Sequence, residues 1–205
     1  RCFESAQGEW VLFVANDVRL HLNCIKGLWS LRDDGLFPFA VGQFQPALFK
    51  PDGTADQMGM DWKWPGYGIS RTKFLGNHTP IVPSSCYLIR KSVWQSLGGF
   101  DVQLLTSHED VDFGLRLQTR GYWNLCRYSS QATHLGNATL RHHASHTRAA
   151  FHRDRVYIIK KHYHGLQRLL RLAAVNLLDS FPRFSRTNNR GYNHSSHDTD
   201  GSHHT

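Results

Sequence analysis

Long apolar runs are absent from the sequence. A membrane-spanning helix needs about 20 consecutive, largely uncharged apolar residues, whereas the most apolar region, residues 156–181, is interrupted by Lys160, Lys161 and Arg168. Closely spaced cysteines are also absent, since no Cys-x-x-Cys pair occurs among Cys2, Cys24, Cys86 and Cys126. This spacing signals neither a zinc site nor a disulfide framework. We therefore expect no membrane span, and cysteines that are reduced and mostly buried.

Acidic residues are fewer than basic ones. The chain has 16 Asp and Glu against 24 Lys and Arg, which gives a formal net charge of +8 over 205 residues. This excess favours anionic partners such as nucleic acid, phosphorylated substrates or acidic lipid surfaces. Because the chain begins at Arg1 without a charged and apolar leader, we expect a fragment of a longer protein. Its 40% hydrophobic content predicts one globular domain followed by a tail.

Strand and helix patterns alternate through the first 140 residues. Apolar runs rich in β-branched and aromatic residues predict strands, and near-helical spacing that ends at Gly predicts helices. The expected strands are residues 9–14, 39–48, 85–90 and 123–128, and the expected helices are residues 20–32, 91–97 and 107–120. This alternation is typical of an α/β domain. We assign the domain to residues 1–140, a helical extension to 141–182 and a disordered tail to 183–205.

Two segments have patterns that leave alternatives open. Residues 58–83 show little periodicity and are predicted to form a binding loop or lid, in which Trp62, Trp64 and Tyr67 either stack on a sugar or base or only pack the loop. Residues 141–181 carry an apolar stripe beside a basic face, formed by Val156, Ile159, Tyr163, Leu166, Leu169, Leu170 and Ala173. We expect this helix to dock on the domain, with peripheral binding to anionic lipid as the alternative.

Two potential metal ligands follow predicted strands. Asp17 comes after the first strand and His134 after the last one. Ligands of open α/β sheets collect at the carboxyl ends of strands. A carboxylate and an imidazole at this position could hold Mn²⁺ or Mg²⁺. Such an ion would neutralise the negative charge that develops on a diphosphate when a sugar is transferred from a nucleotide donor. Taken singly, each residue also has a commoner explanation, an Asp that caps a turn and a half-buried His bonded to backbone.

A second acidic group lies in His108-Glu-Asp-Val-Asp112. Ser107 is the expected N-cap of a helix, and the backbone N–H groups and dipole of its first turn are expected to keep Asp110 ionised. A catalytic base must lie within hydrogen-bond reach of the hydroxyl that it deprotonates. Asp110 is our candidate base, with Glu109 beside it. The alternative is that Asp110 only caps the helix while Glu109 and Asp112 are solvated.

Several motifs occur in the order seen in family 2 glycosyltransferases of the GT-A fold. They are Gly8-Glu-Trp-Val-Leu-Phe-Val-Ala-Asn-Asp17, Pro51-Asp-Gly53, Gly98-Gly-Phe-Asp101, Glu109-Asp-Val-Asp-Phe113, Arg116-Leu117, Gly121-Tyr122 and His134. Over about residues 5–160 the chain most resembles the rhamnosyl- and galactofuranosyl-transferase-like members. The resemblance implies a GT-A-like mixed sheet flanked by helices and truncated at the N-terminus, because the family's first strands would precede Arg1.

The resemblance also implies an activity and a site. The activity is inverting, metal-assisted transfer of a hexosyl or deoxyhexosyl group from a nucleotide-diphosphate sugar to a glycan or lipid-linked acceptor, in polysaccharide biosynthesis. Asp17 would bind the metal together with His134, and Asp110 would be the base. The substrate-binding residues would be Asn16, Asp17, Gly98, Gly99, Phe100 and Asp101, to which we add Trp64 from the aromatic segment. We expect a cytoplasmic protein, with or without contact with the cytoplasmic membrane face.

One position departs from the family's metal motif. Ala15 stands two residues before Asp17, where the family usually has Asn or Asp, so one polar contact is missing. Two other functions stay open: an inactive sugar- or nucleotide-binding remnant, and a basic nucleic-acid-binding protein. Nucleic acid is disfavoured as a partner because the basic residues concentrate after Arg141, away from the aromatic and carboxylate clusters, and no nucleic-acid module signature occurs.

Overall fold

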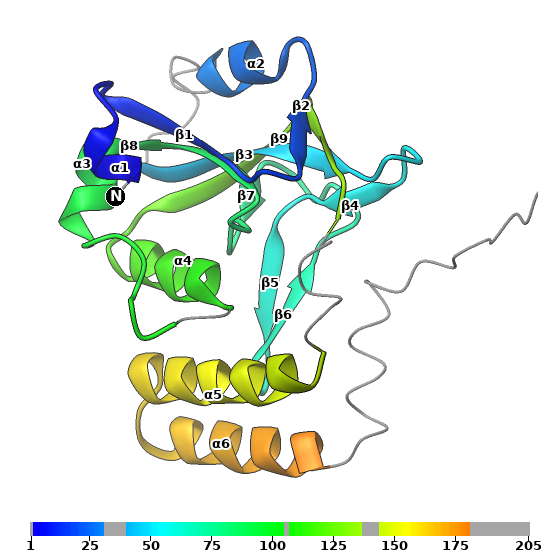
Figure 1. The fold of residues 1–205 in the computed structure, drawn as a ribbon. Coiled ribbons are helices and arrows are strands. Elements are labelled where there is room, and N and C mark those ends of the chain that lie inside the picture. The colour runs from blue at the N-terminus through cyan, green and yellow to red at the C-terminus, as the bar shows by residue number, and fades with distance from the viewer. Residues whose placement is uncertain (1, 31–39, 105–106, 137–143, 181–205) are drawn as a thin grey trace, which may run out of the picture.

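A mixed, seven-stranded sheet forms the centre of the computed structural model, which describes residues 2–30, 40–104, 107–136 and 144–180 (Figure 1). The strands are β1 (Trp10–Val14), β2 (Val18–Leu20), β3 (Val41–Phe49), β4 (Ala55–Gln57), β5 (Met60–Lys63), β6 (Tyr67–Ser70), β7 (His78–Thr79), β8 (Cys86–Arg90) and β9 (Trp123–His134). The helices are α1 (Cys2–Ser5), α2 (Cys24–Ser30), α3 (Lys91–Ser96), α4 (Glu109–Thr119), α5 (Ala144–His162) and α6 (Gly165–Ser180). The predicted α/β class, a mixed sheet flanked by helices, is confirmed.

The sheet has the strand order β1-β8-β3-β9-β2, with β4 paired to β3 and β7 paired to β9. Strands β3 and β9 run parallel, whereas β1 pairs antiparallel with β8 and β2 antiparallel with β9. Consequently the end of β1, the start of β2 and the end of β9 meet at one edge of the sheet. This topology brings the loop after β1 to the end of β9.

Helices cover both faces of the sheet (Figure 1). Residues of α2 pack on one face, where Cys24 and Leu28 join Phe44 and Leu125 in a buried cluster. Residues of α3 and α4 pack on the other face in a second cluster, which includes Tyr87, Ile89, Val93, Phe113 and Leu117. Cys24, Cys86 and Cys126 are free and buried, as predicted.

Several predicted boundaries change. The expected helix over residues 20–32 is replaced by β2 and the shorter α2, and the strand expected to end at residue 128 continues to His134. The expected loop over residues 58–83 contains the β5–β6 hairpin and β7. Short strands in this segment pair with each other or with β9, so their stability comes from cross-strand contacts that a local apolar pattern does not reveal.

The predicted C-terminal helix is two antiparallel helices, α5 and α6, joined at a turn with Gly165 at φ 52°. Ile158 and Ile159 of α5 are fully buried, and Ile158 shares a hydrophobic cluster with Ile81 and Val111. Because the turn reverses the chain, residues predicted to share one apolar stripe lie on different surfaces. The helices among the described residues are too short or too polar to cross a membrane.

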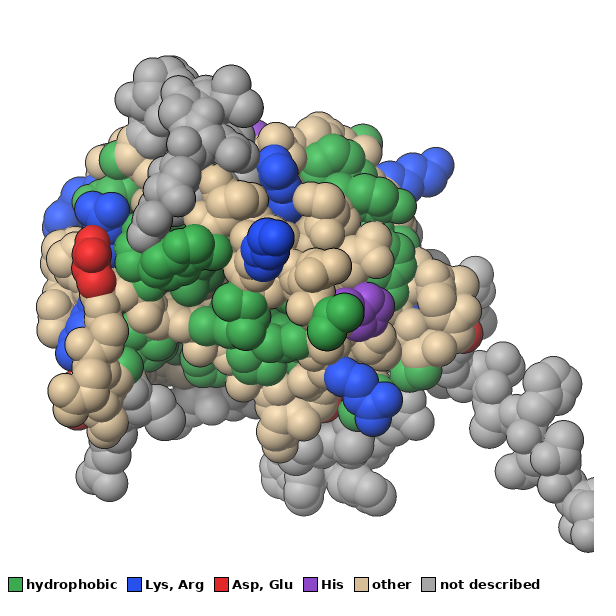
Figure 2. Space-filling model, turned by 90° about the horizontal axis from the view of Figure 1, so that it is seen from above, with side chains coloured by type: hydrophobic (Ala, Val, Ile, Leu, Met, Phe, Trp, Pro, Cys, Tyr) green, Lys and Arg blue, Asp and Glu red, His purple; other side chains and the backbone are tan. Residues whose placement is uncertain are grey.

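The surface seen from the side of α2 shows several hydrophobic patches interspersed with Lys and Arg (Figure 2). Among the exposed hydrophobic residues of the α2 segment are Leu22, Ile25 and Trp29. Acidic side chains are sparse on this face, in keeping with the net charge of +8.

Candidate active site

Asp17 and His134 are brought together by strand pairing. Val18 lies opposite His134 in the β2–β9 pair, and the Leu135 N–H donates to the Asp17 carbonyl oxygen at 2.8 Å. This ladder places Asp17 Oδ2 3.3 Å from His134 Nε2. The imidazole is buried, with 6% of its surface exposed, whereas Asp17 is half-buried. The predicted pair of metal-type ligands is therefore adjacent in the structure.

Asp56 completes this group and was not found from the sequence. It lies in β4, and its Oδ2 is 2.6 Å from His134 Nδ1. The hydrogen bond to Asp56 raises the pKa of His134, burial opposes it, and the charges of Asp56 and Asp17 add to the increase. The signal in the sequence is weak, because a single Asp three residues after a turn is an ordinary surface residue.

The three side chains suit a divalent cation in their chemistry. A histidine ligand commonly presents one nitrogen to the metal while the other bonds a carboxylate that fixes its orientation. His134 has this arrangement, with Nε2 toward Asp17 and Nδ1 toward Asp56. The mixed oxygen and nitrogen donors suit Mn²⁺ better than Ca²⁺. In the part of the chain that the structure describes, no group of three or more such residues forms a complete metal site.

Helix α4 does not begin with Ser107 as its N-cap, as was predicted. His108, not Ser107, precedes the helix, in the left-handed region at φ 65° and without a side-chain cap. The N–H of Ser107 instead donates to the buried Asp154 on α5, at 3.2 Å. A non-glycine residue in this region is strained, and such strain persists only where its surroundings hold it. Burial lowers the pKa of the His108 imidazole to about 4, which keeps the ring neutral beside Glu109.

Asp110 has a higher pKa than predicted. Burial and the neighbouring Glu109 charge raise the pKa of Asp110 to about 7, although the N–H groups of Val111 and Ser84 donate to its carboxylate. The expectation that the helix start would hold Asp110 fully ionised is thus wrong, because desolvation outweighs the backbone hydrogen bonds. The residue as a whole is half-buried.

Ser84 and Ser85 connect the two acidic groups. The Ser84 N–H donates to Asp110 Oδ2 at 3.3 Å, and its hydroxyl donates to Glu109 Oε1 at 2.8 Å. The Ser85 carbonyl oxygen accepts from the N–H of Ala15, two residues before Asp17, at 2.8 Å. The Ser85 hydroxyl also donates to Gln57, the neighbour of Asp56. The predicted base and the backbone that leads to Asp17 therefore contact the same two-residue segment.

The turn Gly98-Gly-Phe-Asp101 is held by contacts within the protein. Asp101 Oδ2 accepts hydrogen bonds from Tyr157 and Lys161 of α5. Burial opposes ionisation of Asp101, but these hydrogen bonds and that from the N–H of Gln103 lower its pKa to about 2. Phe100 packs against Trp94 and Phe113, and Arg116 donates to the carbonyl oxygens of Leu97 and Gly99. The assignment of this turn to substrate binding stays a prediction.

Asp112 is buried rather than solvated, which corrects one of the alternatives considered for α4. None of its surface is exposed, and it pairs with Arg116 at 2.8 Å, Lys161 at 2.8 Å and His162 at 2.7 Å. Burial opposes its ionisation, but the hydrogen bonds from His162 and Lys161 and the Arg116 charge outweigh it and lower the pKa of Asp112. Asp112 thus links the helix that bears Asp110 to the end of α5.

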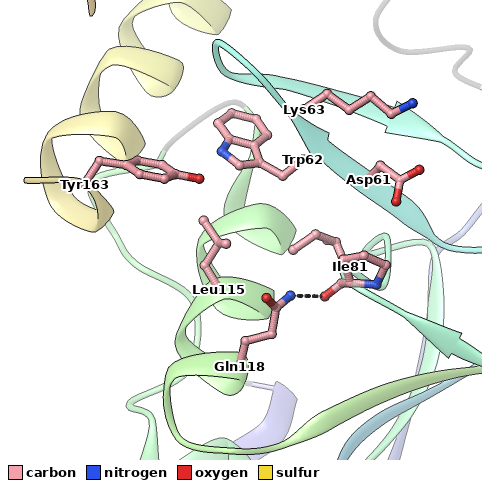
Figure 3. Close-up of a pocket in the computed structure, with 8 residues that line it drawn as sticks. Asp61, Trp62, Lys63, Ile81, Leu115, Gln118 and Tyr163 are labelled. Carbon is pink, nitrogen blue, oxygen red and sulfur yellow. Dashed lines mark hydrogen bonds between the residues drawn. The ribbon is translucent and has the colours of Figure 1, made fainter. Parts of the chain in front are cut away.

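Trp64, predicted to bind substrate, is 61% exposed and lies outside the cavity that its segment lines. That cavity, about 380 Å³ in volume, lies between the β5–β6 hairpin, α4 and the end of α5 (Figure 3). Trp62, Leu115, Gln118 and Tyr163 line it, and the indole N–H of Trp62 has no acceptor among the described residues. It contains neither Asp17 nor Asp110, so it is separate from the site above.

Comparisons with known proteins agree with this fold. The chain is 28% identical over 155 residues to the O-antigen biosynthesis protein RfbC of Myxococcus xanthus, a match that covers 67% of this chain and 12% of that protein. A comparison with models of protein families found no match. Among solved structures, GalNAc-T7 with UDP, GalNAc and Mn²⁺ has a TM-score of 0.54 at 13% identity and covers 67% of this chain.

Two further structures match almost the whole chain. The mannosyltransferase PcManGT from Pyrobaculum calidifontis, in complex with GDP-Man and Mn²⁺, has a TM-score of 0.51 at 12% identity and covers 93% of this chain. TarS from S. aureus, in complex with UDP-GlcNAc, has a TM-score of 0.51 at 18% identity and covers 92%. The chain spans 30%, 51% and 53% of GalNAc-T7, PcManGT and TarS, respectively.

These structural matches establish the fold. The chain has the fold of the GT-A glycosyltransferases, which confirms the resemblance seen in the sequence motifs. In sequence, 67% of this chain is similar to part of RfbC of Myxococcus xanthus.

Proposed function

We propose that this chain carries the metal- and base-bearing part of an inverting glycosyltransferase site. The reaction would transfer a hexosyl or deoxyhexosyl group from a nucleotide-diphosphate sugar to a hydroxyl of a glycan or lipid-linked acceptor. The observation that carries the proposal is that the segment Ser84-Ser85 bonds both Asp110 and the end of the strand that leads to Asp17, which lies 3.3 Å from His134. A leaving diphosphate and an attacking hydroxyl must flank one sugar carbon, so the groups that serve them must be neighbours.

Asp17 and His134 would hold Mn²⁺ or Mg²⁺, with Asp56 fixing the imidazole. A divalent ion supplies positive charge against the diphosphate as it leaves. The protein's own contribution is to present a carboxylate oxygen and an imidazole nitrogen 3.3 Å apart at the sheet edge. The Asp56 hydrogen bond to Nδ1 directs Nε2 of His134 toward Asp17 and that position.

Asp110 would act as the general base. The acceptor oxygen attacks the anomeric carbon, the bond from that carbon to the diphosphate breaks, and the hydroxyl proton passes to Asp110. A single displacement from the face opposite the leaving group inverts the configuration. A pKa of about 7 suits this role, because a base is most effective when its pKa lies near the working pH.

The similar proteins support the substrate class. Their structures were determined with UDP, GDP-Man or UDP-GlcNAc, two of them with Mn²⁺, and the sequence relative is an O-antigen biosynthesis protein. We infer a nucleotide-sugar donor and a role in polysaccharide biosynthesis on the cytoplasmic side of the membrane. The chain spans only part of the length of these proteins. We therefore also propose, rather than observe, the contacts to the nucleotide, in addition to those proposed for Asp17 and His134.

The test combines binding with turnover. Nucleotide release from UDP-, GDP- and dTDP-sugars would be measured with Mn²⁺ for the chain alone and for the chain joined to any upstream coding sequence. Asp110→Asn should abolish transfer but keep Mn²⁺-dependent nucleotide binding, while Asp17→Asn should weaken both. Glu9→Gln, on an exposed side chain, is the matched control. Equal turnover by Asp110→Asn would refute the base assignment, and binding without turnover in the wild type would favour the inactive remnant.

A further inference from the structure

The chain enters α4 through one residue in an unfavourable backbone conformation. His108, at φ 65°, is the one non-glycine residue with a positive φ in the part of the chain that the structure describes. It directly precedes Glu109 and Asp110, so its backbone angles set the direction in which α4 starts and hence where the Asp110 carboxylate lies. A residue of this size seldom adopts the left-handed conformation, and neighbouring groups must hold it there.

Asp154 of α5 holds this turn through hydrogen bonds. Its carboxylate is fully buried, and its Oδ2 accepts from the N–H of Ser107 at 3.2 Å and from the Ser107 hydroxyl at 3.4 Å. The Ser107 oxygen is also 2.6 Å from His108 Nδ1. A proton on Nδ1 satisfies the whole chain of groups, because Nδ1–H then donates to the Ser107 oxygen while the hydroxyl donates to Asp154. Asp154 is thus connected to both residues before α4.

The His108 ring is held by aromatic packing on two sides. It meets the Trp62 ring of β5 edge-on at a centroid distance of 5.8 Å and the Phe151 ring of α5 edge-on at 5.4 Å. Phe151 and Asp154 are three residues apart in α5 and therefore lie on the same face of that helix. Figure 1 shows this helix beside α4 and one end of the β5–β6 hairpin. One face of α5 therefore fixes both the backbone and the ring of His108.

We propose that Asp154 is a positioning residue for the reaction: by fixing Ser107 and His108, it holds the Asp110 carboxylate in its orientation against Ser84. This inference rests on the proposed function, because it concerns the orientation of the proposed base. The sequence motifs quoted above end at His134, so the inference extends the functional part of the chain to α5. Asp154 touches none of the proposed metal ligands, and its role is confined to the base.

Asp154 acts on Asp110 through position and not through charge. Burial and the Glu109 charge raise the pKa of Asp110 to about 7, and Asp154 is not among the causes of this shift. The other titratable group that interacts with Asp110 is Tyr87 of β8, whose pKa is raised by burial and by the Glu109 and Asp110 charges. Substitutions of Asp154 leave Glu109 and Tyr87 in place. A changed pKa of Asp110 in such a variant would therefore report a moved or rehydrated carboxylate.

Two measurements on the full chain test this inference. Carbon-13 NMR of the aspartate carboxyl carbons, with the Asp110 signal identified by its loss in Asp110→Asn, gives the titration midpoint of Asp110. In Asp154→Ala this midpoint should fall by about 1 pH unit, because a loosened helix start admits water to the carboxylate. The kcat for sugar transfer should fall at least about tenfold with an unchanged KM for the donor, because the base is misplaced while the metal ligands are not.

Two variants separate the hydrogen bond from general loosening. Asp154→Asn keeps a side-chain oxygen that can accept from Ser107, while Arg153, which pairs with the other oxygen and is 53% exposed, can turn to solvent. This variant should resemble the wild type in both measurements. Asp179→Ala is the matched control, since it removes a carboxylate that pairs with Arg155 of the same helix but does not contact Ser107. It should lower stability and leave the Asp110 midpoint and kcat unchanged.

Several results would overturn the inference. They are an unchanged midpoint or an unchanged kcat in Asp154→Ala, equal changes in Asp154→Ala and Asp154→Asn, and the same changes in Asp179→Ala. If Asp154→Ala does not fold, Ser107→Ala replaces it and should lower the midpoint and kcat by smaller amounts. Absence of transfer in the wild type would contradict the proposed function instead, and the NMR midpoints would then decide by themselves whether Asp154 positions Asp110.

Discussion

Replacing Glu109 by Gln changes the charge beside the proposed base while preserving its hydrogen bond. The Gln side-chain oxygen can still accept from the Ser84 hydroxyl, which donates to Glu109 Oε1 at 2.8 Å. The Asp110 carboxylate keeps its own bonds from Ser84 and Val111. The substitution therefore isolates the electrostatic effect of Glu109 on the pKa of Asp110.

The size of this effect follows from the causes of the elevated pKa. The pKa of Asp110 rises from 3.8 to about 7, and burial is the larger cause, with the Glu109 charge second. A like charge within about 4–6 Å typically shifts a pKa by about 1–3 units, and the Glu109 charge is the smaller of the two causes that raise the pKa of Asp110. We expect Glu109→Gln to lower the pKa of Asp110 by about 1 unit, or about 1.4 kcal/mol.

The assay is the pH dependence of kcat/KM for sugar transfer. A base must be deprotonated, so activity should rise with pH through about 7 in the wild type, the pKa of Asp110. In Glu109→Gln this rise should occur about 1 pH unit lower, while Glu9→Gln should leave it in place. An unchanged or higher midpoint in Glu109→Gln would refute the electrostatic reasoning, whatever the change in maximal rate.

Three further predictions concern metal binding and stability. Asp56→Asn should weaken Mn²⁺ affinity about 10–100-fold in titration calorimetry, because the imidazole loses the carboxylate that orients it; unchanged affinity would contradict its role. Asp110→Asn should stabilise the protein by about 1–2 kcal/mol at pH 8 but not near pH 4, since the raised pKa makes ionisation of Asp110 reduce stability as pH rises between these values; denaturant unfolding at both pH values tests the sign. Asp112→Ala should destabilise by about 3–5 kcal/mol, because Arg116 and His162 lose their buried partner; a loss below 1 kcal/mol in the same assay would contradict this account.

The strands and the metal-type pair could be predicted because their signals are local. The apolar run before Asp17 and the strand before His134 each indicate a sheet edge, and the β2–β9 pairing then joins them. Asp56, Ser84 and Ser85 could not be predicted, because each acts through a partner distant in sequence. Register and long-range pairing decide which of many ordinary polar residues meets the site.

Two predictions were wrong for a related reason: that Asp110 is fully ionised, and that the region after residue 141 forms one helix instead of α5 and α6. The helix start favours an ionised Asp110, but the surrounding protein removes water from the carboxylate and Glu109 adds a like charge. The apolar pattern after residue 141 predicts helix correctly, yet the reversal near Gly165 changes which surface each leucine faces. In both places tertiary contacts override a correct local preference.

The pairing of Val18 with His134 has a thermodynamic consequence for the proposed metal ligands. Asp17 and His134 sit on or beside hydrogen-bonded strands, and Asp56 restrains the ring, so most of their conformational entropy is lost when the sheet forms. A ligand that meets them then orders little additional backbone. Preorganisation of this kind predicts that metal binding raises the unfolding temperature without altering the far-ultraviolet circular dichroism of the folded chain.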